Sequence, residues 1–533
     1  MKTIRHCSHN STKETAEVTM NRQENSAPRP ADKGSDATRE RNPIFVDMTG
    51  RRRRIIWLVC GIIAAIAIAF TEPLLRSVDS FLGVFNWILI LAAGLVIFRL
   101  VVVEVCATHH LLAARRSPHL SQSSTFLGPV SIVVPAYNEE AGIEHTLRSL
   151  AASTHPELEI IVVDDGSTDR TVEIARGLEI PAVSIIQQPN SGKATALNTG
   201  IAASHHEILI LVDGDTVFEP DAVDHLVRPL IDPRIGAVSG NTKVGNRKGL
   251  IGRWQHVEYV VGFNLDRRMF ELLECMPTVP GAIGAFRRQV LESVGGFSAD
   301  TLAEDTDITM AICRSGWRVV YQPRAIAWTE APATFHQLWL QRYRWCYGTF
   351  QSAWKHRRAL IERGPSGKLG RRGIMYIVLY QLLMPLLAPA VDIYTIYGLI
   401  FLDPVNVLIV WSIYTALQVA SCGRALRLDG ESLGTLWSVP LRHIVYRQLL
   451  YLVVIRSVFA AILGSRLHWH RLERHGSAGA ARDSDRPAPR EATRALTEPG
   501  SLWPIPRPGM IPAAPTSTSP STTAPLGPER DRR

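Results

Sequence analysis

Long apolar runs lie on both sides of a more polar central segment. Residues 55–70 and 84–103 are nearly continuous in apolar side chains, and residues 373–402, 405–420 and 444–463 repeat the pattern further on. Runs of this length approach or reach what a helix needs to cross a bilayer. The pattern therefore predicts a helical membrane hairpin before the central segment and a membrane region after it.

The central segment alternates short apolar runs with amphipathic ones. Apolar runs of this kind are typical of strands that are buried on both faces, and alternation with helices predicts a parallel sheet covered by helices. Ligands of such sheets collect at the carboxyl ends of the strands. The strands are expected at residues 131–134, 159–163, 183–186 and 207–212, and the helices at 141–152, 169–177 and 194–203.

Positive charge predicts the orientation of the first hairpin. Arginines occupy residues 51–54 before the first run, and Arg115 and Arg116 follow the second. Such clusters favour the cytoplasmic side, so the central domain is expected there too. Three simple spans after the domain would place the basic residues 466–474 outside. One Pro-containing segment is therefore an alternative candidate for an interfacial or re-entrant position, and the number and orientation of these spans stay open.

The composition narrows the classes of function. The net charge is +9, but much of the basic excess borders the apolar runs, and no nucleic-acid-binding signature is present, so we expect no nucleic-acid partner. The seven cysteines are irregularly spaced and form no CxxC pair, which suggests neither a disulfide framework nor a zinc site. We expect a disordered segment at 1–50, a transmembrane hairpin at 51–107, a catalytic domain at 129–363, a membrane region at 373–465 and a disordered Pro-rich tail at 476–533.

Two pairs of carboxylates follow expected strands. Asp213 and Asp215 flank a glycine after an apolar run, and this arrangement can hold Mg²⁺ or Mn²⁺ together with substrate phosphates. The alternative is an ordinary polar turn. Asp164 and Asp165 end another strand and could accept hydrogen bonds from a nucleobase or a ribose. Capping of the helix that follows is an alternative that does not exclude this role.

Three further charged residues suggest transfer chemistry. Lys193 lies at an expected helix start, where a cation and the helix dipole could meet a diphosphate, although an exposed lysine is the alternative. Glu304 and Asp305 are adjacent, and like charges raise a carboxyl pKa and suit one member to general base catalysis. A solvated acidic loop is the alternative for this pair.

Gln341, Arg344 and Trp345 form a Q-x-x-R-W pattern in an amphipathic segment rich in Trp and Arg. An arginine here can neutralise a leaving diphosphate, and a tryptophan face can stack on a sugar ring. Anchoring at a membrane interface is the alternative for most of the segment.

Taken in order, these motifs resemble those of the family 2 glycosyltransferases, and specifically of the membrane-embedded processive polysaccharide synthases. The poly-β-N-acetylglucosamine synthases are the most similar, with hyaluronan and chitin synthases as neighbours. Cellulose synthase is less similar, because the Pro-rich tail offers no strands for its C-terminal barrel. The resemblance rests on residues 134–139, Asp164-Asp165, the D-x-D pattern, Glu304-Asp305 and Q-x-x-R-W.

The resemblance implies a GT-A (Rossmann-like) α/β fold, a UDP-sugar donor and Mg²⁺ or Mn²⁺. It also places small residues in an acceptor-cradling loop at 280–285, where a sugar can approach the backbone. The implied roles are uridine binding for Tyr137, Glu139, Asp164 and Asp165, diphosphate binding for Lys193, metal and UDP binding for Asp213 and Asp215, catalysis for Asp305 beside Glu304, and donor and acceptor contacts for Gly281, Gly284, Gln341, Arg344 and Trp345.

The implied function is inverting transfer of a sugar, with N-acetylglucosamine as the best guess, to a growing β-linked polysaccharide that passes into the membrane. The acceptor is a polysaccharide or a lipid, the other expected partners are membrane lipids, and accessory export subunits are an open option. The expected location is the plasma (inner) membrane, with several passes. Addition of one sugar to make a glycolipid is the alternative, and a scaffold with a degenerate domain is the alternative from another class.

Overall fold

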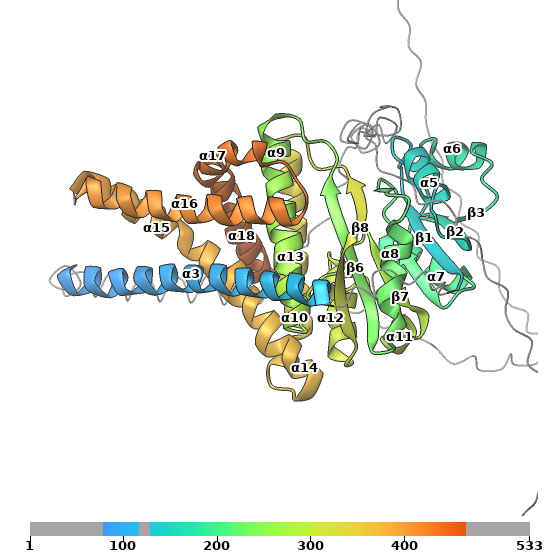
Figure 1. Cartoon of the computed structure of the whole chain (residues 1–533), viewed down its shortest axis with the longest axis horizontal. Coiled ribbons are helices and arrows are strands. Elements are labelled where there is room, and N and C mark those ends of the chain that lie inside the picture. Colours follow the sequence, from blue (N-terminus) through green and yellow to red (C-terminus); the bar gives the residue numbers. More distant parts are fainter. Residues whose placement is uncertain (1–77, 117–127, 402, 465–533) are drawn as a thin grey trace, which may run out of the picture.

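The computed structural model describes residues 78–116, 128–401 and 403–464 (Figure 1). Long helices gather at one end of the molecule, and an α/β domain occupies the other. The first apolar run at 55–70 and the expected disordered segments lie outside the described residues. Helix α3 (Val78–Arg116) contains the second run and continues beyond it, while the pairing of the two runs in a hairpin stays a prediction.

The α/β domain is built on an eight-stranded sheet with the order β3-β2-β1-β4-β7-β6-β8-β5. The first four strands are parallel, as the apolar pattern predicts, and Val133 of β1 pairs with both Ile161 of β2 and Leu211 of β4. These strands are β1 (Val130–Ala136), β2 (Leu158–Asp164), β3 (Val183–Gln187) and β4 (Ile208–Leu211).

The other half of the sheet is mixed, and the prediction of a parallel sheet does not extend to it. Strand β7 runs antiparallel to β4 and β6, β8 is parallel to β6, and β5 is antiparallel to β8. Strand β6 is buried along its length, yet glycine and polar residues interrupt its apolar pattern. The strands are β5 (Val217–Phe218), β6 (Ile235–Val244), β7 (Gly284–Arg287) and β8 (Arg318–Thr329).

Helices cover both faces of the parallel half, as expected. Ile132 of β1 packs in one apolar cluster with Leu147 of α5, and Val133 packs in another with Leu197 of α7. Consecutive strand residues thus feed opposite cores. The helices of the domain are α5 (Ile143–Ala151), α6 (Thr171–Gly177), α7 (Lys193–Ala203), α8 (Ala222–Val227), α9 (Gly249–Glu258), α10 (Asp266–Leu272), α11 (Arg288–Ser293), α12 (Glu304–Arg314) and α13 (Phe335–Lys355).

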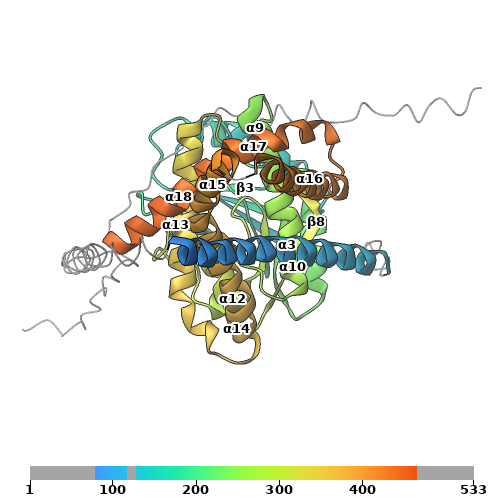
Figure 2. The same ribbon diagram turned by 90° about the vertical axis from the view of Figure 1, so that its left-hand side faces the viewer.

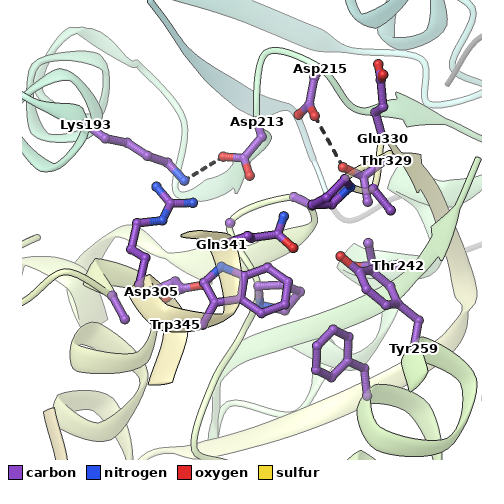
Figure 3. Close-up of a pocket in the computed structure, with 18 of the residues that line it drawn as sticks. Lys193, Asp213, Asp215, Thr242, Tyr259, Asp305, Thr329, Glu330, Gln341 and Trp345 are labelled. Atoms are coloured by element: carbon purple, nitrogen blue, oxygen red, sulfur yellow. Dashed lines mark hydrogen bonds and ion pairs between the residues drawn. The ribbon is translucent and has the colours of Figure 1, made fainter. Parts of the chain in front are cut away.

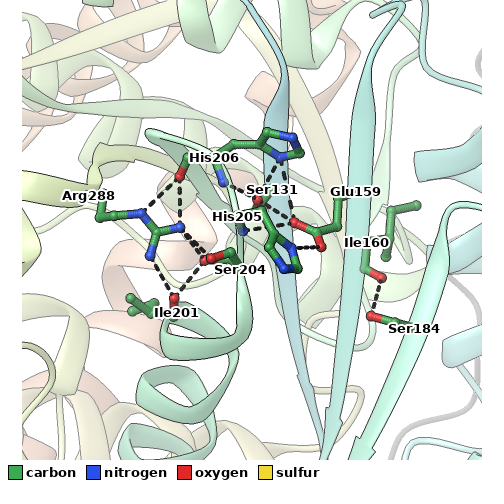
Figure 4. A network of polar contacts seen from close by, with 9 residues as sticks. All are labelled: Ser131, Glu159, Ile160, Ser184, Ile201, Ser204, His205, His206 and Arg288. Atoms are coloured by element: carbon green, nitrogen blue, oxygen red, sulfur yellow. Dashed lines mark hydrogen bonds and ion pairs between the residues drawn. The ribbon is translucent and has the colours of Figure 1, made fainter.

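A polar network fixes α7, whose first residue is Lys193 (Figure 4). Arg288 donates hydrogen bonds of 2.8–3.1 Å to three main-chain carbonyl groups within residues 201–206, at the carboxyl end of the helix. Such carbonyls have no partner inside a helix, and a cation there also suits the helix dipole. Beside it, Glu159 of β2 lies 2.7 Å from the His205 ring. The far end of α7 is therefore anchored to the sheet.

Within the described residues, four helical stretches are long and apolar enough to cross a membrane, judged by length and composition. They carry exposed apolar side chains, such as Trp87 and Val410. Between the last two lie the short helices η6 (Leu433–Ser438) and α17 (Val439–Ile444). The four are Trp87–Ala113, Gly364–Phe401, Pro404–Leu428 (α16) and Tyr446–Leu463 (α18).

The stretch Gly364–Phe401 changes its helical type along its length. It begins as α14, passes through two π-helical segments and ends as α15, with Pro389 inside the last helix. Proline residues and π-helical turns are common causes of bends in long helices. Its parts are α14 (Gly364–Lys368), η4 (Leu369–Ile374), η5 (Ile377–Leu383) and α15 (Met384–Phe401).

Ion pairs join the long helices to the α/β domain. Helix α3 lies against α10 (Figures 1 and 2), where Arg99 and Asp266 are 2.6 Å apart. After α16, Glu431 and Asp429 lie 2.7 and 3.4 Å from the buried Lys243 of β6. Because buried charges need partners, these contacts tie the two parts of the molecule together.

Candidate active site

A pocket lies where the carboxyl end of β4 approaches α12 and α13 (Figure 3). Several separate parts of the chain contribute to it, among them the start of α7, the turn after β4, the loop before β7, the first turn of α12 and one face of α13. Residues of β6, of the segment 259–263 and of the end of β8 with the loop after it complete the lining. Most of the residues expected from the sequence meet here. They are Lys193, Asp213, Asp215, Gly281, Glu304, Asp305, Gln341, Arg344 and Trp345.

Lys193 is held by the carboxylates around it. Its Nζ atom lies 2.6 Å from Asp213 Oδ1 and 2.9 Å from Glu304 Oε1. Burial favours the neutral amine, but the negative charges of Asp213, Glu304 and Asp305 outweigh it and hold the pKa of Lys193 above its ordinary value. The alternative of a simple exposed lysine is therefore wrong, and a fixed cation stands in the pocket.

Glu304 and Asp305 form the first turn of α12, not a solvated loop. Removal from water, followed by the charge of Glu304, raises the pKa of Asp305 to about 6, and Lys193 opposes the shift. The direction agrees with the sequence prediction, with burial as the larger cause. Asp305 also accepts a hydrogen bond of 2.7 Å from the Thr306 N–H, which fixes the carboxylate. A carboxyl group with this pKa can accept a proton near neutral pH.

Asp213 and Asp215 offer hard oxygen atoms to a cation. Asp215 is buried, and its Oδ2 accepts a hydrogen bond of 3.4 Å from Thr329, while Asp213 pairs with Lys193. Among the described residues, no group of three or more His, Cys, Asp or Glu side chains could hold a metal ion. Two carboxylates fit Mg²⁺ or Mn²⁺ where phosphates and water complete the coordination.

Helix α13 presents the Q-x-x-R-W residues to the pocket. The helix begins earlier than this pattern, at Phe335, and Thr334 caps it by accepting a hydrogen bond from the Gln337 N–H. Gln341 and Trp345 are four residues apart, so they share a helix face. Trp345 meets Phe263 at 5.8 Å between ring centroids, and an aromatic wall results.

Asp164 and Asp165 are buried at the end of β2 but do not line this pocket. Asp165 accepts hydrogen bonds from the N–H groups of Ser191 and Gly192, at 2.9 and 2.8 Å, in the loop that leads to Lys193. Asp164 accepts one of 3.2 Å from the Ser167 N–H. Both carboxylates thus shape turns, and their roles in uridine binding stay predictions.

Tyr137, Glu139 and Gly284 also lie outside the pocket lining. A Cβ atom built on Gly214 would be 3.1 Å from Glu139 Cγ, so Glu139 lies beside the D-G-D turn. Gly284 starts β7 and pairs with Leu211 inside the sheet, which makes a direct contact with a sugar difficult. For Tyr137 and Glu139 the predicted uridine contacts stay untested.

Residues 128–348 match the family described as glycosyltransferase like family 2. The chain contains a family 2 glycosyltransferase domain. The match begins just before β1 and ends within α13, so it covers the whole sheet and every pocket residue. The expected GT-A class is confirmed for this domain.

Two curated relatives resemble the glycosyltransferase domain. A poly-beta-1,6-N-acetyl-D-glucosamine synthase of Staphylococcus epidermidis is 32% identical over 224 residues, which are 41% of this chain and 54% of that protein. The Staphylococcus aureus protein of the same name is 29% identical over 261 residues, which are 48% of this chain and 62% of that protein. The chain thus spans little more than half the length of the curated relatives it matches.

Solved structures also resemble the domain at low identity. A mannosyltransferase from Pyrobaculum calidifontis, in complex with GDP-Man and Mn²⁺, is 23% identical with a TM-score of 0.45, over 65% of this chain and 99% of that one. S. aureus TarS residues 1–349, in complex with UDP-GlcNAc, is 17% identical with a TM-score of 0.36, over 62% and 92% of the two chains.

Several pocket residues of the glycosyltransferase domain were not predicted. Tyr259 and Phe263 face Trp345, and their spacing of four in an apolar segment was an available signal. Gln337 lies one turn before Gln341 on α13, so the helical period could have found it. The others come from strand pairing or loops that no local pattern reveals. They include Thr242, Thr329 and Glu330.

Proposed function

We propose that this chain is a membrane-embedded, inverting glycosyltransferase that extends a β-linked polysaccharide from a UDP-sugar. The observation that carries the proposal is the meeting of Lys193, the D-G-D carboxylates, Asp305 and the Q-x-x-R-W face in one pocket. N-acetylglucosamine is the sugar we favour, because the relatives at 32% and 29% identity carry the name of poly-beta-1,6-N-acetyl-D-glucosamine synthases.

The donor would bind through its diphosphate. Asp213 and Asp215 would hold Mg²⁺ or Mn²⁺, and the bound cation would supply positive charge to the phosphate oxygens. Lys193 and Arg344 line the same pocket and would add fixed positive charge. Fixed cations stabilise the charge that grows on a leaving diphosphate without reorganising during the reaction.

Asp305 would act as the general base. Its carboxylate would remove the proton from the acceptor hydroxyl as that oxygen attacks the anomeric carbon, and UDP would leave with the electron pair of the broken bond. Attack opposite the leaving group converts an α-linked donor to a β-linked product. A pKa of about 6 keeps Asp305 ionised at neutral pH, yet basic enough to accept the proton.

The acceptor would lie against the aromatic wall formed by Tyr259, Phe263 and Trp345. Ring centroids in this wall are 4.6–6.5 Å apart, and such faces suit the apolar side of a sugar ring. The long helices would form the path by which a product enters the membrane, with the domain at 129–363 on the cytoplasmic side of the plasma membrane.

The first test uses purified protein in lipid nanodiscs with Mg²⁺ or Mn²⁺ and a panel of UDP-sugars, with UDP release and product size as readouts. Asp305→Asn should lower turnover about 100-fold or more while UDP still binds, because only the base is lost. Glu173→Gln, in an exposed pair on α6, is the matched control and should keep full activity.

Product size separates the proposal from its alternative. Long polymer from UDP-N-acetylglucosamine alone supports the polysaccharide proposal. A product that carries one sugar on a lipid would replace it with glycolipid synthesis. Failure of the wild-type protein to bind UDP in the presence of Mn²⁺ would contradict an active transferase altogether.

A further inference from the structure

Arg342 touches the pocket residues without lining the pocket itself. Its guanidinium carbon lies 4.4 Å from the centroid of the Trp345 ring, and its Nη1 donates a hydrogen bond to Gln341 Oε1. The side chain is 5% exposed. Arg342 therefore contacts two of the three Q-x-x-R-W residues from behind, where no substrate can reach it.

The guanidinium is itself fixed by Glu258. Arg342 Nε and Nη2 donate to Glu258 Oε1 and Oε2, at 3.1 and 2.6 Å, in a two-point contact that sets the plane of the group. Burial raises the pKa of Glu258, but the positive charge and hydrogen bonds of Arg342 outweigh this effect and hold the pKa below its ordinary range. Glu258 ends α9 and directly precedes the π-helix η2 (Tyr259–Leu265), which carries Tyr259 and Phe263 into the pocket.

A third member of the cluster comes from a helix that could span the membrane. Tyr446, the first residue of α18, is fully buried, and its hydroxyl donates to Glu258. The same oxygen accepts a hydrogen bond of 3.5 Å from Arg342 Nη2. The ring of Trp254 packs edge-on against Tyr446 at 5.9 Å. The start of α18 thus contacts Arg342, the residue that packs against Trp345.

We propose that Arg342 is a positioning residue for sugar transfer, which aligns Gln341 and Trp345 and takes its own orientation from Glu258 and Tyr446. Through this cluster the placement of α18 sets the geometry of the pocket. A displacement of about 1 Å at a reacting group can cost a large factor in rate, so small changes here should reach turnover. The inference rests on the proposed function in one respect, because the reaction whose rate Arg342 affects is the proposed sugar transfer.

The test compares Arg342→Lys and Tyr446→Phe with Tyr376→Phe. Lysine keeps the charge but loses both the two-point contact and the flat face that stacks on Trp345. Tyr376 is the matched control, because its hydroxyl also joins an arginine–aspartate pair beside a long helix, Arg99 and Asp266, away from the pocket.

Two readouts are measured on the full chain in detergent micelles. The first is kcat and KM for the UDP-sugar, and the second is the ¹⁹F resonance of 5-fluorotryptophan at Trp345, assigned by Trp345→Phe. Arg342→Lys should lower kcat about 10-fold with little change in KM, and Tyr446→Phe about 3-fold. Both should shift the Trp345 resonance, and Tyr376→Phe should change neither readout.

A double variant tests whether Tyr446 acts through Arg342. The combined loss in Arg342→Lys with Tyr446→Phe should be smaller than the product of the single losses, since both disturb one contact. An unchanged Trp345 resonance in both single variants would overturn the inference. A shifted resonance in a protein that transfers no sugar would instead support the positioning role and reject the proposed function.

Discussion

Gly281 lies at a point of close approach in the pocket. A Cβ atom there would be 2.7 Å from Lys193 Nζ and 3.1 Å from Asp213 Oδ1, so Gly281→Ala must push these groups apart. We expect about 10-fold weaker turnover, because the fixed cation moves away from the diphosphate. Gly262→Ala is the control, since nothing lies within 4 Å of a Cβ at that position. Steady-state UDP release measures the activity of both variants. Equal activity of the two would contradict the assignment of the loop at 280–285 to the site.

Asp305 should give the pH profile of kcat/KM an acidic limb. The base works only when ionised, so the rate should fall as the pH drops through about 6 and level off above it. A cation on Asp213 and Asp215 would move this limb lower, not higher. Glu304→Gln removes a like charge from beside Asp305 and should also move the limb to lower pH. A limb that moves to higher pH in this variant would exclude Asp305 as the base.

At the residue scale, sequence motifs predicted most of the residues that meet in the pocket, but not the contacts that hold them in place. Asp213, Asp305 and Trp345 belong to local patterns with a chemical meaning, and the pocket contains all three. Arg342 stands inside the Q-x-x-R-W pattern, yet its importance comes from Glu258, which lies 84 positions away in the chain. Contacts of this kind depend on the fold, and no spacing in the sequence announces them.

At the element scale, α12 owes its position to a buried carboxylate. Asp307 accepts a hydrogen bond of 2.6 Å from Lys355 and lies 2.9 Å from His356 Nε2, both at the end of α13. The contact joins the helix of Asp305 to the helix of Q-x-x-R-W. Asp307→Asn should therefore lower the free energy of unfolding by about 2 kcal/mol, less than a fully buried pair because Lys355 is 28% exposed.

The matched control for Asp307→Asn is Glu173→Gln. Its partner is Arg170, both side chains are at least two-thirds exposed, and the loss of stability should be negligible beside that of Asp307→Asn. Denaturant titration of the purified protein in detergent measures both variants. Equal stability of the two would mean that α12 and α13 are held by their apolar contacts alone.

The elements themselves were predictable where one pattern repeats. The first four strands follow from continuous apolar runs and the helices between them from the amphipathic segments that alternate with those runs. The bounds of both differ from expectation by a few residues at most. Strand β6 did not stand out, because it is buried between partners while carrying Gly236, Gly240 and Asn241. A strand whose burial comes from its neighbours on both sides has no need of an unbroken apolar run.

For the whole molecule, several polar contacts within the described part of the chain join the long helices to the domain. Arg99 meets Asp266, Lys243 meets the residues after α16, and Tyr446 meets Glu258. The sequence predicted the two parts separately, since these partners lie more than 160 positions apart. Because these contacts are buried or half-buried, we expect the domain and the long helices to unfold together in one transition.

The variant Lys243→Met tests whether the two parts unfold together. Lys243 is 8% exposed and lies between Asp429 and Glu431, so its loss leaves buried carboxylates short of a partner, at a cost of about 3 kcal/mol. Two buried thiols report on the two parts, Cys313 in α12 and Cys422 in α16. On heating in detergent, alkylation read by mass spectrometry should reach both thiols in one transition in the wild-type protein.

In Lys243→Met the junction after α16 is weakened, so Cys422 should react at a lower temperature than Cys313, and the single transition should divide. Lys248→Met changes an exposed lysine five residues further on and should leave both thiols in the shared transition. Independent reaction of the two thiols already in the wild-type protein would show that the ion pairs do not unite the parts. A shared transition that merely moves to lower temperature in Lys243→Met would show that other contacts, such as those at Arg99 and Tyr446, are enough to hold the two parts together.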